Sequence, residues 1–216
     1  MPFRHIDTWV FDLDNTLYPS QAEILDRVHD KINAFIMDYF KIPLEEAENK
    51  RKDFYKKYGT TLYGMMSEHK INPDEYLRAV HEVDISGIPL CPVTAQGLEN
   101  LPGRRIVFTN SAREHAERVL SHLGIAPLFE DIYDIRAAGF ISKPHPAPYA
   151  QMIERYAINP KTACMVEDMA KNLVPAHACG MTTVWISGEQ PLDEATPKDA
   201  VHHRFTTLTD WMKQHD

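Results

Sequence analysis

The chain has 216 residues, of which 44% are hydrophobic and 25% are charged, and its formal net charge at pH 7 is −8. This length and composition predict a globular protein with a substantial core, built as one domain with room for an inserted module. The acidic balance argues against nucleic acid polymers and membranes as partners, since both favour basic protein surfaces. No apolar run approaches the ~20 residues that span a bilayer, and no secretory hydrophobic segment opens the chain.

The three cysteines, Cys91, Cys164 and Cys179, lack CxxC spacing. An odd number of thiols in this arrangement indicates reduced, packed side chains rather than a disulfide or a zinc site. We therefore expect a cytoplasmic protein. Its oligomeric state is left open between monomer and homodimer.

The most informative stretch lies near the N-terminus, where an apolar run ends in Asp12 and Asp14. If residues 10–13 form a strand, alternation places both carboxylates on one side of the strand tip. Their mutual repulsion must be offset there, and a divalent cation can offset it. The pattern predicts a Mg²⁺ site in which Asp12 is the nucleophile and Asp14 donates and accepts protons.

A helical block follows these two aspartates. Residues 20–23 have the form of a capping box, and apolar residues at three- and four-residue steps extend the predicted helix to just before Pro43. Further helices are predicted over residues 44–58 and, behind an Asn72 cap, over residues 73–83. We therefore expect a helical cap over residues 18–89, inserted between the core segments 1–17 and 90–216.

Strands and helices then alternate. Strands are predicted over residues 105–110, 131–135, 163–166 and 182–186, and helices after a second capping box at residues 111–114, over residues 146–156, and from an Asn172 cap to Gly180. Residues 187–199 indicate a surface loop, and His202, His203 and Trp211 are expected in surface or edge packing. The alternation predicts an α/β fold with a doubly wound, mostly parallel sheet.

Polar residues follow several of the predicted strands: Thr109 and Asn110 after one, Glu167 and Asp168 after another. Ligands of such sheets bind beyond the carboxyl ends of the strands, so these residues should share a cleft with Asp12 and Asp14. Taken singly, Thr109-Asn110 is typical of a helix cap and Glu167-Asp168 of a polar turn. Lys143, in the segment Ser142-Lys143-Pro144-His145-Pro146, is by itself typical of a solvated loop.

The combination fits the hydrolysis of a phosphate monoester, for which enzymes supply up to ~10²¹-fold acceleration. Asp12 would attack the phosphorus and form an aspartyl-phosphate, while Asp14 would protonate the leaving alcohol and then deprotonate water. Lys143 would neutralise charge on the nucleophile and the phosphate, and Thr109 with the Asn110 amide would hold phosphate oxygens. Mg²⁺ would bind Asp12, the Asp14 carbonyl, Asp168 and Glu167.

These residues together resemble the four ordered motifs of the haloacid dehalogenase (HAD) superfamily of phosphohydrolases. The motifs correspond to Asp12-Leu13-Asp14-Asn15-Thr16, Thr109-Asn110, Lys143-Pro144-His145-Pro146 and Val166-Glu167-Asp168. The inserted helices correspond to the helical cap of the superfamily's first cap class. Many relatives carry Asp-Asp in the fourth motif, so the resemblance predicts that Asp168 contacts the metal directly and Glu167 directly or through water.

A narrower similarity concerns the substrate. Asp14-Asn15-Thr16-Leu17-Tyr18-Pro19, with Tyr58-Gly59-Thr60-Thr61-Leu62 in the cap, is similar to the pyrimidine 5′-nucleotidase subfamily. This implies hydrolysis of UMP or CMP. The alternatives are a sugar-phosphate or phosphoglycolate-type phosphatase, a phosphomutase, a dehalogenase and a non-catalytic binding module. Asp14 argues against a dehalogenase, because a leaving halide needs no proton.

Overall fold

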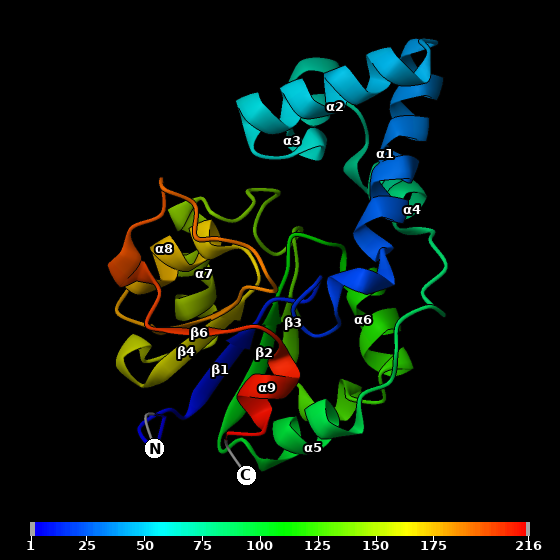
Figure 1. Cartoon of the computed structure of the whole chain (residues 1–216). Helices are drawn as coiled ribbons and strands as arrows, with labels where there is room; N and C mark the ends of the chain where they lie inside the picture. The colour runs from blue at the N-terminus through cyan, green and yellow to red at the C-terminus, as the bar shows by residue number, and fades with distance from the viewer. Residues whose placement is uncertain (1–2, 215–216) are drawn as a thin grey trace.

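A computed structural model describes residues 3–214. Its centre is a six-stranded sheet in the order β3-β2-β1-β4-β5-β6, and all its neighbouring strands are parallel (Figure 1). The strands are β1 (Thr8–Phe11), β2 (Arg104–Phe108), β3 (Asp131–Tyr133), β4 (Ala163–Glu167), β5 (Thr182–Ile186) and β6 (His203–Phe205). The predicted α/β fold with a doubly wound parallel sheet is confirmed.

Helices surround this sheet and rise above it. The α-helices are α1 (Ile24–Phe40), α2 (Leu44–Tyr58), α3 (Thr61–His69), α4 (Pro73–His81), α5 (Pro92–Asn100), α6 (Arg113–His122), α7 (Pro146–Arg155), α8 (Ala170–Ala178) and α9 (Leu208–Met212). Short 3-10 helices occupy Ser20–Ala22, Ala126–Leu128, Pro160–Thr162 and Lys198–Ala200.

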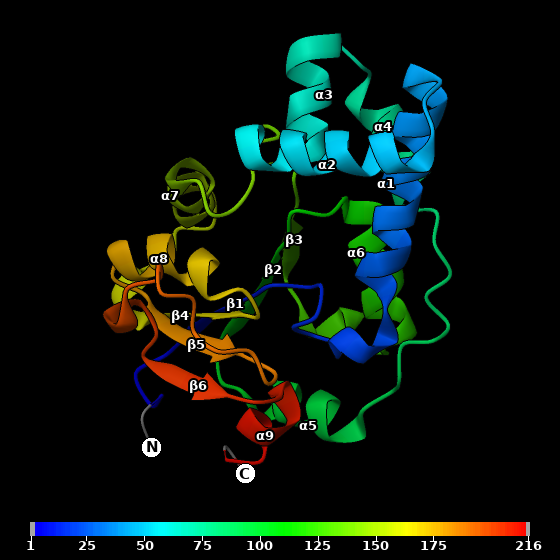
Figure 2. The same ribbon diagram turned by 45° about the horizontal axis from the view of Figure 1, so that its top comes forward.

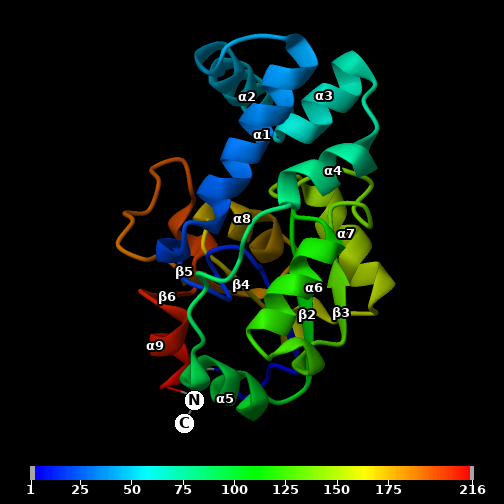
Figure 3. The ribbon, with the colours of Figure 1, turned by 90° about the vertical axis from the view of Figure 1, so that its right-hand side faces the viewer.

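Both faces of the sheet are buried, which explains the nearly continuous apolar runs of its central strands. Trp9 and Phe11 of β1 pack on the face covered by α5, α6 and α9, whereas Val10 packs on the face covered by α7 and α8. Figure 3, a view from the side, shows α5 and α6 beside the sheet. Because β1 pairs with β2 on one side and β4 on the other, the residues after it lie at the middle of the sheet edge.

Helices α1 to α4, which we call the cap helices, lie above the sheet (Figure 2). The chain enters them shortly after β1 and returns to the sheet region through α5. Leu62, Leu77 and Val80 of the cap helices form an apolar cluster with Ala112 and Ile135, which belong to the sheet region. The cap helices therefore pack against the segments that follow β2 and β3.

Two predicted capping boxes are wrong. Helix α1 begins at Ile24 rather than Ser20, because Glu23 has a left-handed backbone (φ 56°) that separates it from the short 3-10 turn. Helix α6 begins at Arg113 after Ala112, with no side-chain cap, since the Ser111 hydroxyl donates to Asp14 instead. In both places the side chain that matched the capping pattern has no capping role.

The predicted Asn172 cap is also wrong. Asn172 lies inside α8, whose N-terminal flanking residue is Met169, and its side chain donates to Glu167. Three further elements, α3, α5 and β6, were not predicted. Gly59 and Gly64 interrupt the apolar pattern around α3, α5 is only nine residues long behind Pro92, and β6 is a three-residue edge strand.

The sequence predicted surface or edge packing for Trp211, but this residue lies in the core. Its side chain is 0% exposed and packs against the rings of Phe3, Trp9 and Phe11. The short helix α9 thus closes the lower part of the core. The thiols of Cys91, Cys164 and Cys179 form no disulfide, as predicted, and Cys164 is fully buried.

Candidate active site

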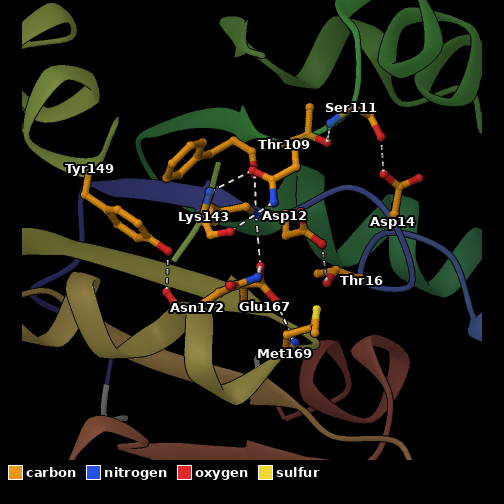
Figure 4. A network of polar contacts seen from close by, with 12 residues as sticks. Asp12, Asp14, Thr16, Thr109, Ser111, Lys143, Tyr149, Glu167, Met169 and Asn172 are labelled. Carbon is orange, nitrogen blue, oxygen red and sulfur yellow. Dashed lines mark hydrogen bonds and ion pairs between the residues drawn. The ribbon is translucent and has the colours of Figure 1, made fainter. Parts of the chain in front are cut away.

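Lys143 lies at the centre of the polar network at the sheet edge (Figure 4). Its ammonium group donates to Asp12 Oδ1 at 2.7 Å, to Glu167 Oε1 at 2.9 Å and to the carbonyl oxygen of Phe108 at 2.8 Å. A lysine ammonium has three donors, so all of them are used. Lys143 is buried, and although burial lowers its pKa, the charges of Asp12 and Glu167 outweigh that effect and raise it. It therefore remains a cation.

Glu167, at the end of β4, is fully buried, and both its carboxylate oxygens accept hydrogen bonds. Oε1 accepts from Lys143 and, at 2.5 Å, from the Asn172 side chain, and Oε2 accepts from the Met169 backbone N–H at 2.6 Å. These contacts fix the carboxylate against the first turn of α8. The orientation of Lys143 follows from this fixed partner.

Asp14 is held by three side chains, one from the loop after β1 and two from around the start of α6. Tyr18 and Ser111 donate to its two oxygens at 2.6 and 2.7 Å, and His115 Nε2 lies 3.4 Å from Oδ1. Burial raises the pKa of Asp14, but the hydrogen bond and charge of His115, with the bonds from Tyr18 and Ser111, outweigh burial and hold that pKa below its usual range. Asp14 is thus kept as a carboxylate.

The sequence prediction did not include Tyr18, Ser111 or His115 as functional residues. Tyr18 lies four residues after Asp14, a spacing that could have suggested a contact within one turn. Ser111 was assigned to a capping box, although it directly follows the Thr109-Asn110 motif. His115, on α6, carries no local signal, because only the packing of α6 on the sheet brings it to Asp14.

Three carboxylates converge beside this network. Asp12, Glu167 and Asp168 each place an oxygen within 4.8 Å of the other two. Burial and the neighbouring carboxylates raise the pKa of Asp12 to about 7, despite Lys143, and raise that of Asp168 to about 10. Oxygen donors with this excess of negative charge fit Mg²⁺, which binds one or two carboxylates and would relieve their repulsion.

The second motif lies beside Lys143. The Asn110 side chain brackets the Lys143 backbone, accepting from its N–H at 2.8 Å and donating to its carbonyl oxygen at 3.3 Å. The Thr109 hydroxyl accepts from the Ser111 N–H at 2.9 Å, and Thr109 is only 1% exposed. Asn110 lines the pocket above the network, whereas Thr109 lies behind the pocket wall.

This pocket joins the sheet edge to the cap helices. Its lower wall contains Asp12, Asp14, Lys143 and Asp168, together with Asn110. Its upper wall belongs to the cap helices: α1 and α4 contribute a largely apolar part, and residues of α2 and the start of α3 add polar side chains, among them Arg51 and Tyr55. The apolar part consists of Leu25, Val28, Ile32, Tyr76, Leu77 and Val80. The structure thus brings all the predicted site residues except Thr109 to one pocket, with Glu167 at its floor.

Comparison with known proteins identifies relatives of the chain. Phosphate metabolism protein 8 of Saccharomyces cerevisiae is 27% identical over 190 residues, which cover 79% of this chain and 58% of the yeast protein. A phosphoglycolate phosphatase of Haemophilus influenzae is 30% identical over 126 residues, covering 55% of each chain. The chain therefore matches little more than half the length of these two relatives.

Solved structures share the fold. A HAD phosphatase of Thermococcus onnurineus superposes with a TM-score of 0.66 at 17% identity, over 97% of each chain. A HAD hydrolase of Bacillus subtilis, bound to magnesium, superposes with a TM-score of 0.62 at 18% identity, over 98% of this chain and 99% of the other. The haloacid dehalogenase-like hydrolase family matches residues 6–180. The superfamily resemblance is confirmed, and the chain belongs to the haloacid dehalogenase-like hydrolases.

Proposed function

We propose that this hydrolase is a Mg²⁺-dependent phosphomonoesterase that works through an aspartyl-phosphate on Asp12. The observation that carries the proposal is the buried Lys143 cation, bonded to Asp12 and Glu167 in the pocket that also holds Asp14. A nucleophilic carboxylate, a fixed cation and a second carboxylate for proton transfer are the parts that phosphoryl transfer to an aspartate needs. Relatives named as phosphatases support the same reaction class.

Asp12 and Asp168, with the Asp14 main-chain carbonyl, would hold Mg²⁺, and Glu167 would contact it directly or through water. The ion would neutralise phosphate oxygens and withdraw charge from the phosphorus. Glu167 has a second task that its hydrogen bonds make clear, since it fixes Lys143. The structural neighbour bound to magnesium is consistent with this cofactor.

The proposed reaction has two steps, formation of the aspartyl-phosphate and its hydrolysis. In the first, an Asp12 oxygen bonds to phosphorus, the bond from phosphorus to the ester oxygen breaks, and Asp14 gives its proton to the leaving alcohol. In the second, Asp14 takes a proton from water, whose oxygen bonds to phosphorus and releases Asp12 and inorganic phosphate. The three hydrogen bonds to Asp14 favour its ionised form, which accepts the proton from water in the second step.

The substrate that we propose is a pyrimidine nucleoside 5′-monophosphate, UMP or CMP. The largely apolar wall formed by α1 and α4 supports a substrate with a sizeable ring beyond the phosphate. The chief alternative is a phosphoglycolate-type or sugar-phosphate phosphatase, which the Haemophilus relative favours. A phosphomutase remains a further alternative, in which a bound sugar rather than water takes the phosphate.

We also propose that the protein acts in the cytoplasm on small phosphorylated molecules, as a monomer or homodimer, without nucleic acid polymers or membranes as partners. Its net charge of −8 supports this, because it disfavours binding to polyanions. Within residues 3–214, no helix has the length and apolar character to cross a membrane.

The test is phosphate release from phenyl phosphate with and without Mg²⁺. We expect activity with Mg²⁺, none after EDTA treatment, and recovery when Mg²⁺ is restored. Asp12→Asn should lower kcat on the order of 10⁴-fold or more while the circular dichroism spectrum stays unchanged. Asp53→Asn, which changes an exposed acid of α2, is the matched control. Turnover without metal, or an active Asp12→Asn protein, would refute the mechanism.

A panel of UMP, CMP, 2-phosphoglycolate and sugar phosphates tests the substrate. Higher kcat/KM for UMP and CMP than for the other compounds is the expected result. Equal or better turnover of 2-phosphoglycolate or a sugar phosphate would remove the pyrimidine assignment while leaving the phosphatase assignment intact. Transfer of phosphate to a sugar instead of water would indicate a mutase.

A further inference from the structure

Arg51 of α2 brings a positive charge to the upper wall of the pocket, far along the chain from every catalytic motif. It is half-buried, and among the residues that the structure describes it forms no ion pair with a carboxylate. Most charged side chains in a protein of this kind are solvated or paired. A half-buried guanidinium that faces a pocket without an acidic partner therefore has donors available for a ligand.

The position of this guanidinium is fixed by the cap itself. Arg51 Nε donates to the side-chain oxygen of Asn33 at 3.0 Å, and Asn33, on α1, is only 4% exposed. The Arg51 carbonyl oxygen also accepts from the Thr61 hydroxyl at 3.5 Å. Arginine has five N–H donors, and the contact to Asn33 leaves the two terminal nitrogens as a planar fork. A buried partner holds the base of that fork, which reduces the entropy lost when the fork binds a ligand.

His29 lies in the same wall, one helix away on α1. Burial and the charge of Arg51 lower the pKa of His29, outweighing the opposite effect of Asp26 and Asp30. The imidazole is thus a neutral neighbour that adds no second positive charge. Val28 and Ile32, on the same helix as His29, add apolar surface to this wall, and Tyr55 and Thr60 add further polar groups.

We infer that Arg51 determines specificity by donating hydrogen bonds to a ring carbonyl oxygen of the leaving group, as in uracil or cytosine, while the apolar wall covers the ring. This inference rests on the proposed function and adds to it the residue that recognises the base. A two-carbon carboxylate such as glycolate could also bind a guanidinium, but it would leave the apolar wall of α1 and α4 without a partner. A pyrimidine uses both features of the wall.

The test compares kcat/KM for UMP and CMP with kcat/KM for phenyl phosphate, whose ring has no carbonyl oxygen. In Arg51→Met we expect kcat/KM for UMP, divided by kcat/KM for phenyl phosphate, to fall about 10- to 100-fold. This is the effect of losing one or two hydrogen bonds, since a tenfold change corresponds to about 1.4 kcal/mol. Arg51→Gln keeps a neutral donor and should recover part of the ratio. Arg51→Lys keeps the charge but loses the planar fork, so it should recover less of the ratio. The reason is that a hydrogen bond to a neutral carbonyl oxygen depends more on the placement of the donor than on its charge.

Lys52→Met is the matched control, because it removes the neighbouring cation of α2 from an exposed position outside the pocket. It should leave the ratio unchanged. An unchanged ratio in Arg51→Met would overturn the inference, and so would a larger loss with 2-phosphoglycolate than with UMP, because that result assigns Arg51 to a carboxylate. A wild-type protein without activity on phenyl phosphate would instead contradict the proposed function.

Discussion

At the scale of single residues, the site depends on charge balance around Lys143. This side chain is 1% exposed and lies between two carboxylates that are themselves almost fully buried. A buried pair that loses one member leaves an uncompensated charge, which is strongly destabilising. The cation that we propose for catalysis is therefore also a structural one.

Lys143→Met should lower the free energy of unfolding in EDTA by about 3–5 kcal/mol, since Asp12 and Glu167 then lose their shared counter-charge. Urea denaturation followed by fluorescence measures this change. The double variant Lys143→Met/Glu167→Gln should recover part of the loss, because one of the two buried carboxylates is gone. Lys161→Met, an exposed lysine, serves as the control. A loss below about 1 kcal/mol would contradict the assignment of Lys143 as the compensating charge.

The residue types of the catalytic motifs were predictable, because Asp12, Asp14, Asn110, Lys143 and Asp168 all follow strands or occupy the loop between them and all line one pocket. Their supporting residues were not. His115 approaches Asp14 only through the packing of one helix, a contact between residues far apart in sequence that no local pattern encodes. A hydroxyl such as that of Ser111 can cap a helix or bind a carboxylate, and the folded structure decides between them.

At the scale of elements, one of the contacts between the cap helices and the sheet region is aromatic. His81, at the end of α4, stacks on His115 of α6 with ring centroids 4.8 Å apart. His81 Nδ1 donates to the Leu77 carbonyl oxygen at 2.9 Å within its own helix. Burial, helped by the charges of His115 and Arg136 and opposed by that of Asp14, lowers the pKa of His81 from 6.5 to about 4.

This shift predicts a pH dependence of stability. The unfolded chain takes up a proton at His81 near pH 6.5, whereas the folded protein resists protonation until about pH 4. The contribution of neutral His81 to the free energy of unfolding is thus fully present above pH 6.5. It is lost as the pH falls toward 4, and the total loss is at most about 3 kcal/mol. Wild type should lose more stability between pH 7 and pH 4.5 than His81→Phe, which retains an aromatic ring without the titration. If the free energy of unfolding falls equally for wild type and His81→Phe between pH 7 and pH 4.5, His81 does not have this role. His5→Asn, which changes an exposed histidine, provides the control.

Helices α1 and α4 were predictable from their apolar periodicity, and α2 from its charged, helix-favouring composition. Helices α2 and α4 begin where predicted, at Leu44 and at Pro73 behind the Asn72 cap, whereas the beginnings of α1, α6 and α8 differ from the prediction. A side chain that matches a capping pattern can bind another partner instead, as Ser111 and Asn172 do when they donate to the carboxylates of Asp14 and Glu167. The short elements α5, β6 and α9 are held by tertiary contacts rather than by their own pattern, as the complete burial of Trp211 illustrates.

At the scale of the whole molecule, polar contacts connect the cap helices to the rest of the structure across the pocket. Arg136, after β3, donates to Asp74 of α4 at 2.6 Å and to Glu114 of α6 at 2.8 Å. On the other side, Lys171 of α8 donates to the Tyr55 hydroxyl of α2 at 2.5 Å. The pocket is therefore bounded by contacts that water and salt can reach.

Arg136→Gln should weaken this connection modestly, because exposed ion pairs contribute about 0–1 kcal/mol. We expect KM for phenyl phosphate to rise a few-fold, with the midpoint of urea unfolding almost unchanged. Raising the ionic strength should bring the KM of wild type closer to that of the variant, since salt screens the pair. Arg78→Gln, an exposed arginine on α4, should match wild type. A wild-type KM that is insensitive to salt would show that the pair does not hold the cap.

The parallel order of the sheet was predictable as a class, whereas the position of β1 between β2 and β4 was not, because pairing across the sheet leaves no trace in local sequence. That position has a consequence for the nascent protein. Thr8 of β1 pairs with Ala163 of β4, so β1, the strand that directly precedes Asp12, acquires this second neighbour only after β4 has been translated. The contacts among α1 to α4 are local by comparison and can form earlier. The cap helices can therefore fold before the sheet is complete, and the pocket between them and the sheet edge is complete only after β4 and the first turn of α8 have been translated.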